Sequence, residues 1–218
     1  MTLNKSEAAI RFREQAKQRV LITDGAFGTM IQNYKLQEAD YRGAYNLKLD
    51  QKGNNDLLVL TRPDVIDEIT RAYLDAGSDI VSTNTFNANI ISQEDYAAVH
   101  LVRDINLAAS RIARTAADEY QARDGRPRFV AGAIGPTNKT LSLSPDVNDP
   151  GFRAVDFDTM RDVYQDQAAA LLDRHGGPHQ CVGLDAHEHD AIAEPLLDPH
   201  TEQRCHLAHG RPEQLELG

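Results

Sequence analysis

The sequence has little cysteine and no long apolar run, and both absences narrow what the protein can be. Only 2 of its 218 residues are cysteine, too few for a disulfide scaffold, so a reducing cytoplasm is the expected location. No stretch is long and apolar enough to span a bilayer, and the N-terminus lacks the apolar core of a signal peptide. We therefore expect neither membrane insertion nor secretion.

Positive charge is also scarce. The chain has 23 Lys and Arg residues against 33 Asp and Glu residues, which gives a formal net charge of −10. Such a surface repels nucleic acid and anionic lipid, so neither is an expected partner. Hydrophobic residues make up 41% and charged residues 26%, the balance of a globular domain. A length of 218 residues suits one domain or part of a larger one.

Short apolar runs alternate with helical patterns from residue 20 to residue 172. Residues 5–19, ahead of this repeat, have high helix propensity and predict an N-terminal helix. The predicted strands are residues 20–22, 79–81 and 129–134, and the predicted helices begin at Pro63, near Leu101 and near Met160. Residues 33–56 show no period and are predicted to form a long loop. Strands that alternate with helices imply parallel strands joined by right-handed crossovers.

All three predicted strands end in polar turns, which read TDGAFGT, STNTFNAN and GAIGPTN. In a (β/α)₈ barrel every strand end converges on the face that carries the site. In a doubly wound sheet only the strands beside the switch point need such ends. We therefore predict an α/β fold, a partial (β/α)₈ TIM barrel that contains the first three β/α units.

The chain changes character near residue 175. Seven of the eight histidines and both cysteines lie between His175 and His209. The period predicts a fourth strand after Asp173, but no run of three large aliphatic residues follows. The residues of this region that could bind zinc are Cys181, His187, His189, Cys205, His206 and His209, and their spacing matches no closed site.

We accordingly divide the chain into an N-terminal helix (1–19), the N-terminal part of a barrel (20–174) and an atypical tail (175–218). The tail is expected to be frameshifted or disordered, and a metal-binding tail is the alternative. Translation of the gene in the other two reading frames would test the first possibility.

Two strand ends carry side chains that could hold an amino acid. The carboxylate of Asp24 could accept hydrogen bonds from an ammonium group, while backbone N–H groups of the same turn could meet a carboxylate. An Asp in such a turn also commonly satisfies its own backbone. Thr83 offers a hydroxyl after the second predicted strand, yet β-branched residues are common in strands for structural reasons. The residues alone leave both possibilities open.

Four segments of the sequence resemble cobalamin-dependent methionine synthases, in the same order and at similar spacing. They are DGAFGTMIQ at 24–32, KGNNDLLVLTRPDVI at 52–66, DAGSDIVSTNTFNAN at 75–89 and VAGAIGPTNKTLSLSPDVNDPGFR at 130–153. The resemblance covers about residues 20–172 and is to the N-terminal, homocysteine-binding domain of that family, a homocysteine S-methyltransferase barrel.

The resemblance implies a methyl transfer from methylcobalamin to the thiolate of homocysteine, which zinc activates. Homocysteine would be the substrate, and cobalamin- and folate-binding domains would be the partners in full-length proteins. Asp24, Gly25 and Ala26 match the motif that holds the amino acid end of the substrate, and Thr83 matches a substrate-contacting position. Relatives often have Glu or Gln at the position where this chain has Ser82.

The sequence departs from the family after residue 174. The fourth-strand Glu and the cysteine motifs that supply the zinc ligands have no counterpart, and Cys181 and Cys205 do not replace them. We therefore assign no catalytic residue and no metal ligand, and expect a fragment that is catalytically incompetent alone. The alternatives are a non-catalytic binding module with a metal-binding tail, and one half of a split barrel that a second chain completes in trans.

Overall fold

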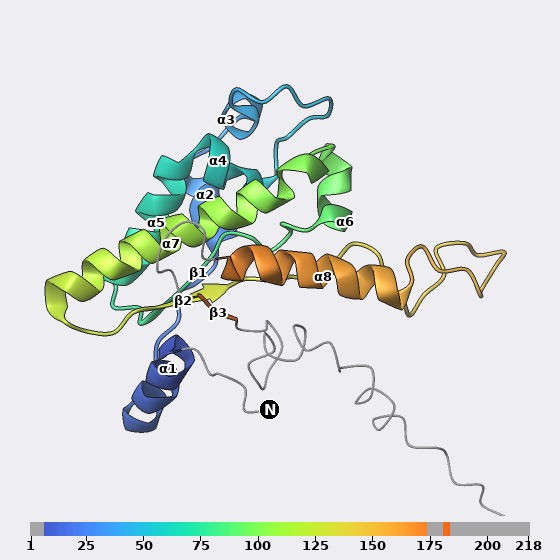
Figure 1. Cartoon of the computed structure of the whole chain (residues 1–218). Helices are drawn as coiled ribbons and strands as arrows, with labels where there is room; N and C mark the ends of the chain where they lie inside the picture. The colour runs from blue at the N-terminus through green and yellow to red at the C-terminus, as the bar shows by residue number, and fades with distance from the viewer. Residues whose placement is uncertain (1–6, 174–180, 184–218) are drawn as a thin grey trace, which may run out of the picture.

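A computed structural model describes residues 7–173 and 181–183 of the chain, and shows a small parallel sheet flanked by helices (Figure 1). The strands are β1 (Ile80–Ser82), β2 (Phe129–Gly132) and β3 (Cys181–Gly183). The α-helices are α1 (Glu7–Gln18), α2 (Phe27–Asn33), α3 (Glu38–Arg42), α4 (Leu58–Thr61), α5 (Pro63–Asp75), α6 (Ile90–Gln93), α7 (Val102–Asp124) and α8 (Phe157–Leu172). Three short 3₁₀ turns are η1 (Asn55–Leu57), η2 (Glu94–Tyr96) and η3 (Val99–Leu101). No helix in these described ranges is long and apolar enough to cross a membrane.

The strands lie in the sheet in the order in which they occur in the sequence. β1 pairs in parallel with β2, and β2 pairs in parallel with β3. On the free side of β1, Thr23 forms a single parallel bridge with Ile80. Four consecutive segments are therefore neighbours in sequence order, and the described sheet has no point at which the order reverses. This order is the one that a (β/α) barrel requires and a doubly wound sheet breaks.

The first predicted strand is shorter in the structure than the sequence indicates. Residues 20–22 form no regular strand, and the contact with β1 is the bridge at Thr23, with backbone bonds from Asp24 N to Ile80 O (2.9 Å) and from Ile80 N to Ile22 O (3.1 Å). Val20 is 84% exposed and Ile22 58% exposed. In the described chain this segment has a partner on one side only, so its apolar side chains are only partly covered.

The structure corrects the prediction that no fourth strand follows Asp173. β3 forms at Cys181–Gly183 and continues the sheet beyond β2. The prediction looked for large aliphatic side chains, whereas pairing with a strand edge uses backbone N–H and C=O groups, which Cys-Val-Gly also provides. Of the six residues named above as able to bind zinc, Cys181 lies in β3 and the other five lie outside the described residues.

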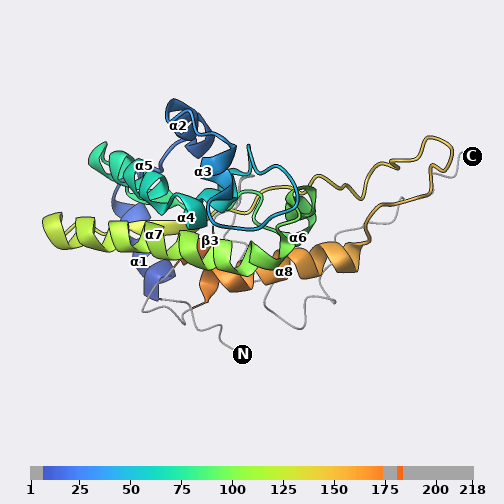
Figure 2. The same cartoon turned by 90° about the horizontal axis from the view of Figure 1, so that it is seen from above.

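A layer of helices covers the outer face of the sheet. α7 runs along the sheet between α5 and α8, and its small residues Ala113, Ala116 and Ala117 pack against Val81 and Val130 (Figures 1 and 2). Alanine allows a close approach of helix to sheet. α7 ends at Gly125, whose φ of +73° is the left-handed conformation that stops a helix. The predicted amphipathic helices thus supply the layer that a parallel sheet needs.

The opposite face of the sheet is covered by α1, the predicted N-terminal helix. Ala8 and Phe12 of α1 contact a cluster of Ile80, Phe129 and Ala131. The rings of Phe12 and Phe129 meet edge to face, with centroids 5.2 Å apart. These contacts place α1 against Ile80 and Phe129, the first residues of β1 and β2 (Figure 1).

The predicted long loop at 33–56 contains regular structure. α3 begins with a capping box, in which the side chains of Gln37 and Asp40 each accept a bond from the backbone of the other. Such a box needs a polar residue at each of two positions three apart. The sequence shows no hydrophobic period for α3, because a helix of five residues is too short to have one.

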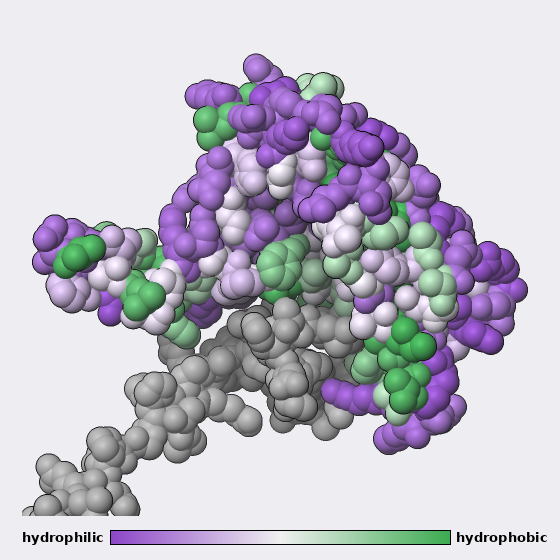
Figure 3. Space-filling model, turned by 180° about the vertical axis from the view of Figure 1, so that it is seen from behind, coloured by the Kyte–Doolittle hydropathy of each residue, from purple (hydrophilic) through white to green (hydrophobic). Residues whose placement is uncertain are grey.

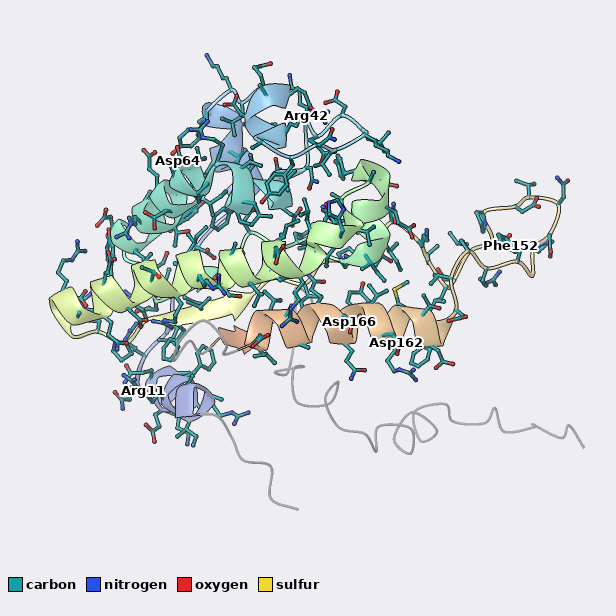
Figure 4. All side chains as sticks on the ribbon, turned by 45° about the horizontal axis from the view of Figure 1, so that its top comes forward. Arg11, Arg42, Asp64, Phe152, Asp162 and Asp166 are labelled. Carbon is teal, nitrogen blue, oxygen red and sulfur yellow. The ribbon has the colours of Figure 1, made fainter. Side chains whose placement is uncertain are left out.

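A long segment between β2 and α8 projects away from the helices (Figures 1 and 2). It exposes Leu143 (68%), Val147 (94%) and Phe152 (48%), and hydrophobic surface is visible on the projection in Figure 3. Phe152 lies far out on it in Figure 4, whereas Asp162 and Asp166 lie on α8. This segment holds the SPDVNDPGF stretch, residues 144–152.

Candidate functional site

The turns that follow Thr23, β1 and β2 lie together at the carboxyl end of the sheet. Parallel pairing in sequence order brings them side by side, and hydrogen bonds join each turn to the next. Asp24 is bonded to Ser82, Thr83 to Ala133 and Gly135 to Phe86. The prediction that the polar strand ends form one cluster is therefore consistent with the geometry.

Asp24 is half-buried at the end of the first segment, and its carboxylate is held by β1. Oδ2 accepts a hydrogen bond from the backbone N–H of Ser82 (2.6 Å), and Oδ1 accepts one from the Ser82 hydroxyl (2.8 Å). The Thr23 hydroxyl donates to Oδ1 at 3.2 Å. Burial raises the pKa of Asp24 above its ordinary value, and the hydrogen bonds from Ser82 and Thr23 offset part of that rise.

Tyr73 of α5 lies over the exposed turn at Gly25 and Ala26. Its hydroxyl donates to the carbonyl of Ala26 at 3.3 Å. A Cβ atom at position 25 would lie 3.1 Å from that hydroxyl oxygen, so the close approach favours glycine there. Burial, followed by the charge of Asp24, raises the pKa of Tyr73. Tyr73 is not among the predicted site residues, since its place within a helix gives no sign of a functional role.

Thr83 is buried, and its hydroxyl both donates and accepts within the protein. Its Oγ1 accepts from the N–H of Ala133 (2.9 Å) and lies 2.6 Å from Oγ1 of Thr85. Since Thr85 donates to the carbonyl of Ala133 (2.7 Å), the proton between the two hydroxyls belongs to Thr83. We call Thr83, Thr85 and Ala133 the threonine clamp, since they join the end of β1 to the end of β2.

The turn after β2 approaches the turn after β1 too closely for a side chain at position 135. The N–H of Gly135 donates to the carbonyl of Phe86 at 3.0 Å. A Cβ atom on Gly135 would lie 2.5 Å from that oxygen and 2.6 Å from the ring of Phe86. Gly135 is therefore required by contact rather than by its backbone conformation.

Residues of the KGNND motif (52–56) form hydrogen bonds with the turn after β1. The side chain of Asn84 donates to the carbonyl of Asn55 (2.7 Å), and the N–H of Asn87 donates to the carboxylate of Asp56 (2.9 Å). Asp56 is 4% exposed, and this burial raises its pKa to about 6. The motif thus has a structural role in this chain that spacing alone did not reveal.

A buried group of amides continues this support. The side-chain amide of Asn54 donates to those of Gln51 (3.2 Å) and Gln93 (2.9 Å), and Gln93 donates back to Asn54 (3.1 Å). Gln51 also donates to the carbonyl of Tyr96 at 2.8 Å. All three amide side chains have 1% exposure or less, so their hydrogen bonds tie the segment before η1 to α6.

A separate cavity of about 320 Å³ lies between α6 and the segment that leads into α8. Its charged lining includes Glu94 and Lys139, which form an ion pair at 2.7 Å. Asp156 also lines it, and its carboxylate caps α8 by accepting from the N–H of Thr159 at 2.7 Å. The acidic groups of this cavity are therefore already committed to partners in the protein.

A zinc site of the kind implied by the resemblance has no counterpart in the described chain. Among residues 7–173 and 181–183, no three His, Cys, Asp or Glu side chains lie close enough to hold a metal ion. The resemblance implies three cysteine ligands, whereas the whole sequence contains two cysteines. The described residues therefore do not fit that group.

One protein family and several solved structures are similar to this chain. The profile of a family described as homocysteine S-methyltransferase matches residues 21–177. Two solved structures of the homocysteine methyltransferase MmuM from Escherichia coli, its metallated and oxidized forms, superpose on the chain with a TM-score of 0.56 and 18% sequence identity. Each match covers 75% of this chain, and 54% and 53% of the respective MmuM chains.

The chain thus spans about half the length of the solved structures that it matches. At 18% identity the likeness concerns the fold. The mixed α/β arrangement, with its small parallel sheet, is similar to the barrel fold of the homocysteine methyltransferases.

Proposed function

The chain belongs to the homocysteine S-methyltransferase family, and from this premise we propose that it supplies the part of the site that holds the amino acid end of homocysteine. Asp24 accepts hydrogen bonds from the substrate ammonium, and the exposed turn at Gly25 and Ala26 meets the carboxylate. The observation that carries the proposal is the Asp24 carboxylate, which is held by two bonds from Ser82 beside an exposed turn. A fixed carboxylate beside accessible backbone is what a zwitterionic ligand needs.

Thr83 has a different place in this proposal. Its hydroxyl is occupied by the threonine clamp, so it would contact the substrate only by exchanging one of those bonds. Its main contribution is to fix the end of β1 beside Asp24. A direct contact with the substrate remains the prediction from the resemblance.

We further propose that the family member is of the cobalamin-dependent methionine synthase type. The sequence segments at 52–66 and 130–153 support this assignment, and both border the candidate site, since Asp56 and Gly135 hold the turn after β1. Cobalamin- and folate-binding domains would then be the partners of this part of the protein. The expected reaction class is methyl transfer to a thiol.

The described residues supply no group that would activate the thiol. They form no metal cluster, so we assign no step of the reaction to zinc or cobalamin in this chain. The described residues would bind and orient the amino acid end, and the groups that activate the thiol would lie outside them. The exposure of Val20 and Ile22 on the open side of the sheet favours completion by a second chain over a self-sufficient binding module.

The proposal is tested by titrating the full chain with three ligands while NMR monitors the backbone amide signals. The ligands are L-homocysteine, L-norvaline (which has a methyl group in place of the thiol) and 4-mercaptobutyrate (which lacks the ammonium). We expect weak, millimolar binding of the first two with similar affinity, about 4 kcal/mol, and shifts centred on residues 24–26. The third ligand should produce no such shifts.

The variant Asp24→Asn should weaken binding of both amino acids by 10-fold or more, about 1.5–3 kcal/mol, because the ammonium loses its charged acceptor. Asp75→Asn is the matched control, since Asp75 is an exposed carboxylate that ends α5 and pairs with Arg123. Equal binding of 4-mercaptobutyrate would contradict the proposal. Micromolar binding of homocysteine alone would show that this chain recognises the thiol, contrary to our assignment.

A further inference from the structure

Ser82, the last residue of β1, makes two hydrogen bonds to one carboxylate. Its backbone N–H donates to Oδ2 of Asp24 at 2.6 Å, and its hydroxyl donates to Oδ1 at 2.8 Å. Both oxygens of the carboxylate are thus engaged from the same side. Since each carboxylate oxygen has two acceptor positions, one position on Oδ2 stays open to a ligand even while Ser82 is bound.

The bond from the Ser82 backbone replaces a bond of the sheet. In a regular parallel ladder, Ile80 N would donate to Ile22 O, Asp24 N to Ile80 O, and Ser82 N to Asp24 O. The first two bonds are present, at 3.1 and 2.9 Å. The third goes to the side chain of Asp24 instead of its carbonyl. The carboxylate therefore ends the pairing, and the backbone of residues 24–26 is free to turn away.

The Ser82 hydroxyl is not needed for this pairing. The bridge at Thr23 and the two backbone bonds already join the segment to β1. The hydroxyl adds a second donor that fixes the rotation of the carboxylate about its terminal bond. Its hydrogen bond also stabilises the ionised form of Asp24, which burial disfavours.

We propose that Ser82 is a positioning residue, which holds the carboxylate of Asp24 in the orientation that receives the ammonium of an amino acid ligand. The proposal rests on the proposed function for its ligand, although the positioning itself concerns Asp24 alone. Ser82 would not touch the substrate. It would act by fixing where the negative charge lies.

The test compares the full chain with the variants Ser82→Ala and Ser82→Thr. Ser110→Ala is the control, because Ser110 is a buried serine whose hydroxyl donates elsewhere, to the carbonyl of Leu171 at 3.4 Å. The first measurement is an NMR titration of the Asp24 carboxyl carbon with pH. The titratable group of α5 on which the charge of Asp24 acts is Tyr73, which titrates at much higher pH.

We expect Ser82→Ala to raise the pKa of Asp24 above its value in the unaltered chain, since the ionised form loses a donor. Ser82→Thr, which keeps the hydroxyl, should restore the lower pKa, and Ser110→Ala should leave it unchanged. The second measurement is the affinity for L-norvaline, which should fall about 5- to 10-fold in Ser82→Ala and recover in Ser82→Thr. A merely structural role would not produce a rescue in both measurements.

The two proposals fail in different ways. If the unaltered chain binds no amino acid while the pKa of Asp24 still responds to Ser82→Ala, the proposed function is wrong and the positioning stands. If amino acids bind but Ser82→Ala changes neither the pKa nor the affinity, the positioning role is wrong. A pKa shift of the same size in Ser110→Ala would also overturn it, because the effect would then be general loosening.

Discussion

The turn at residues 23–26 and the threonine clamp form the two halves of one strand-end cluster, yet their polar groups are used differently. In the first half, Asp24 is half-buried and Gly25 and Ala26 are exposed, so a ligand can reach acceptor and backbone alike. In the second half, Thr83 is 3% exposed and its hydroxyl both donates and accepts inside the protein. A polar residue at a strand end is therefore not by itself a ligand contact.

The difference follows from what borders each half. The clamp lies between two paired strands, where every buried N–H and C=O must find a partner. The Asp24 turn borders the open side of the sheet, where Thr23 makes a single bridge. We infer that in this cluster the closed half gives rigidity and the open half gives recognition. The following predictions test that division, from the largest expected effect to the smallest.

Gly135→Ala should have the largest effect, because it forces a Cβ atom to within 2.5 Å of the carbonyl oxygen of Phe86. We expect a loss of about 3 kcal/mol or more in the free energy of unfolding, since backbone atoms must move to relieve the contact. Urea unfolding followed by far-ultraviolet circular dichroism measures it, as the chain has no tryptophan.

The matched control is Gly28→Ala in α2, where a Cβ atom meets nothing within 4 Å. Alanine is the better helix former there, so the control should be neutral or slightly stabilising, by at most about 1 kcal/mol. Equal losses at both positions would contradict the claim that the closed half is rigid by close contact.

Asp56→Asn should change how stability depends on pH. Burial raises the pKa of Asp56 from an ordinary value of 3.8 to about 6, so the folded chain binds the proton more tightly than the unfolded chain. Stability contributed by this group is therefore present below about pH 4 and is lost as the pH rises through about 6. Relative to Asp56→Asn, the unaltered chain should lose roughly 2–3 kcal/mol between pH 4 and pH 7.

Unfolding of both chains in urea at several pH values gives this difference directly. Asn keeps an acceptor for the N–H of Asn87, so the comparison isolates the charge. Asp75→Asn serves as a control of opposite sign, because a hydrogen bond from Tyr120 lowers the pKa of Asp75. A pH-independent difference for Asp56→Asn would show that its carboxyl titrates normally in the folded chain.

Thr83→Val separates the structural role of Thr83 from its predicted contact with the substrate. The change keeps the shape but leaves the N–H of Ala133 without its acceptor, which should cost about 1–3 kcal/mol of stability. Thr70→Val is the control, since its buried hydroxyl only donates back to Ile66 within α5, and this change should be nearly neutral. If Thr83→Val leaves norvaline affinity unchanged, Thr83 is a clamp residue alone.

The sequence predicted the larger elements of the fold well. α5, α7 and α8 have clear hydrophobic faces, and Pro63 begins α5 as expected. It did not predict α3, whose capping box leaves no hydrophobic period, or β3, which is three residues long and pairs with β2 through its backbone. Periodicity reports which side chains are buried, and short elements bury too few of them to be detected.

The candidate site was only partly predictable for a related reason. The position of Asp24 at a strand end followed from the DGAFGT turn, whereas its two bonds to Ser82 depend on the pairing of segments 58 residues apart. The contact of Tyr73 with Gly25 and the hydrogen bond from Asn87 to Asp56 likewise join segments that are far apart in the sequence. Contacts between distant segments decide which polar groups stay free, and a single sequence does not contain them.

The smallest effect is expected for Val20→Thr on the open side of the sheet. Val20 is 84% exposed, so replacing it should change the free energy of unfolding by less than about 0.5 kcal/mol. Ile80→Thr, at a buried position of β1 with 6% exposure, should cost several times more, about 2 kcal/mol. If Val20→Thr instead costs as much as Ile80→Thr, in a manner that depends on protein concentration, a second chain already covers this side in solution. The open half of the cluster would then be bordered by a partner, and the contrast with the threonine clamp would belong to the isolated chain only.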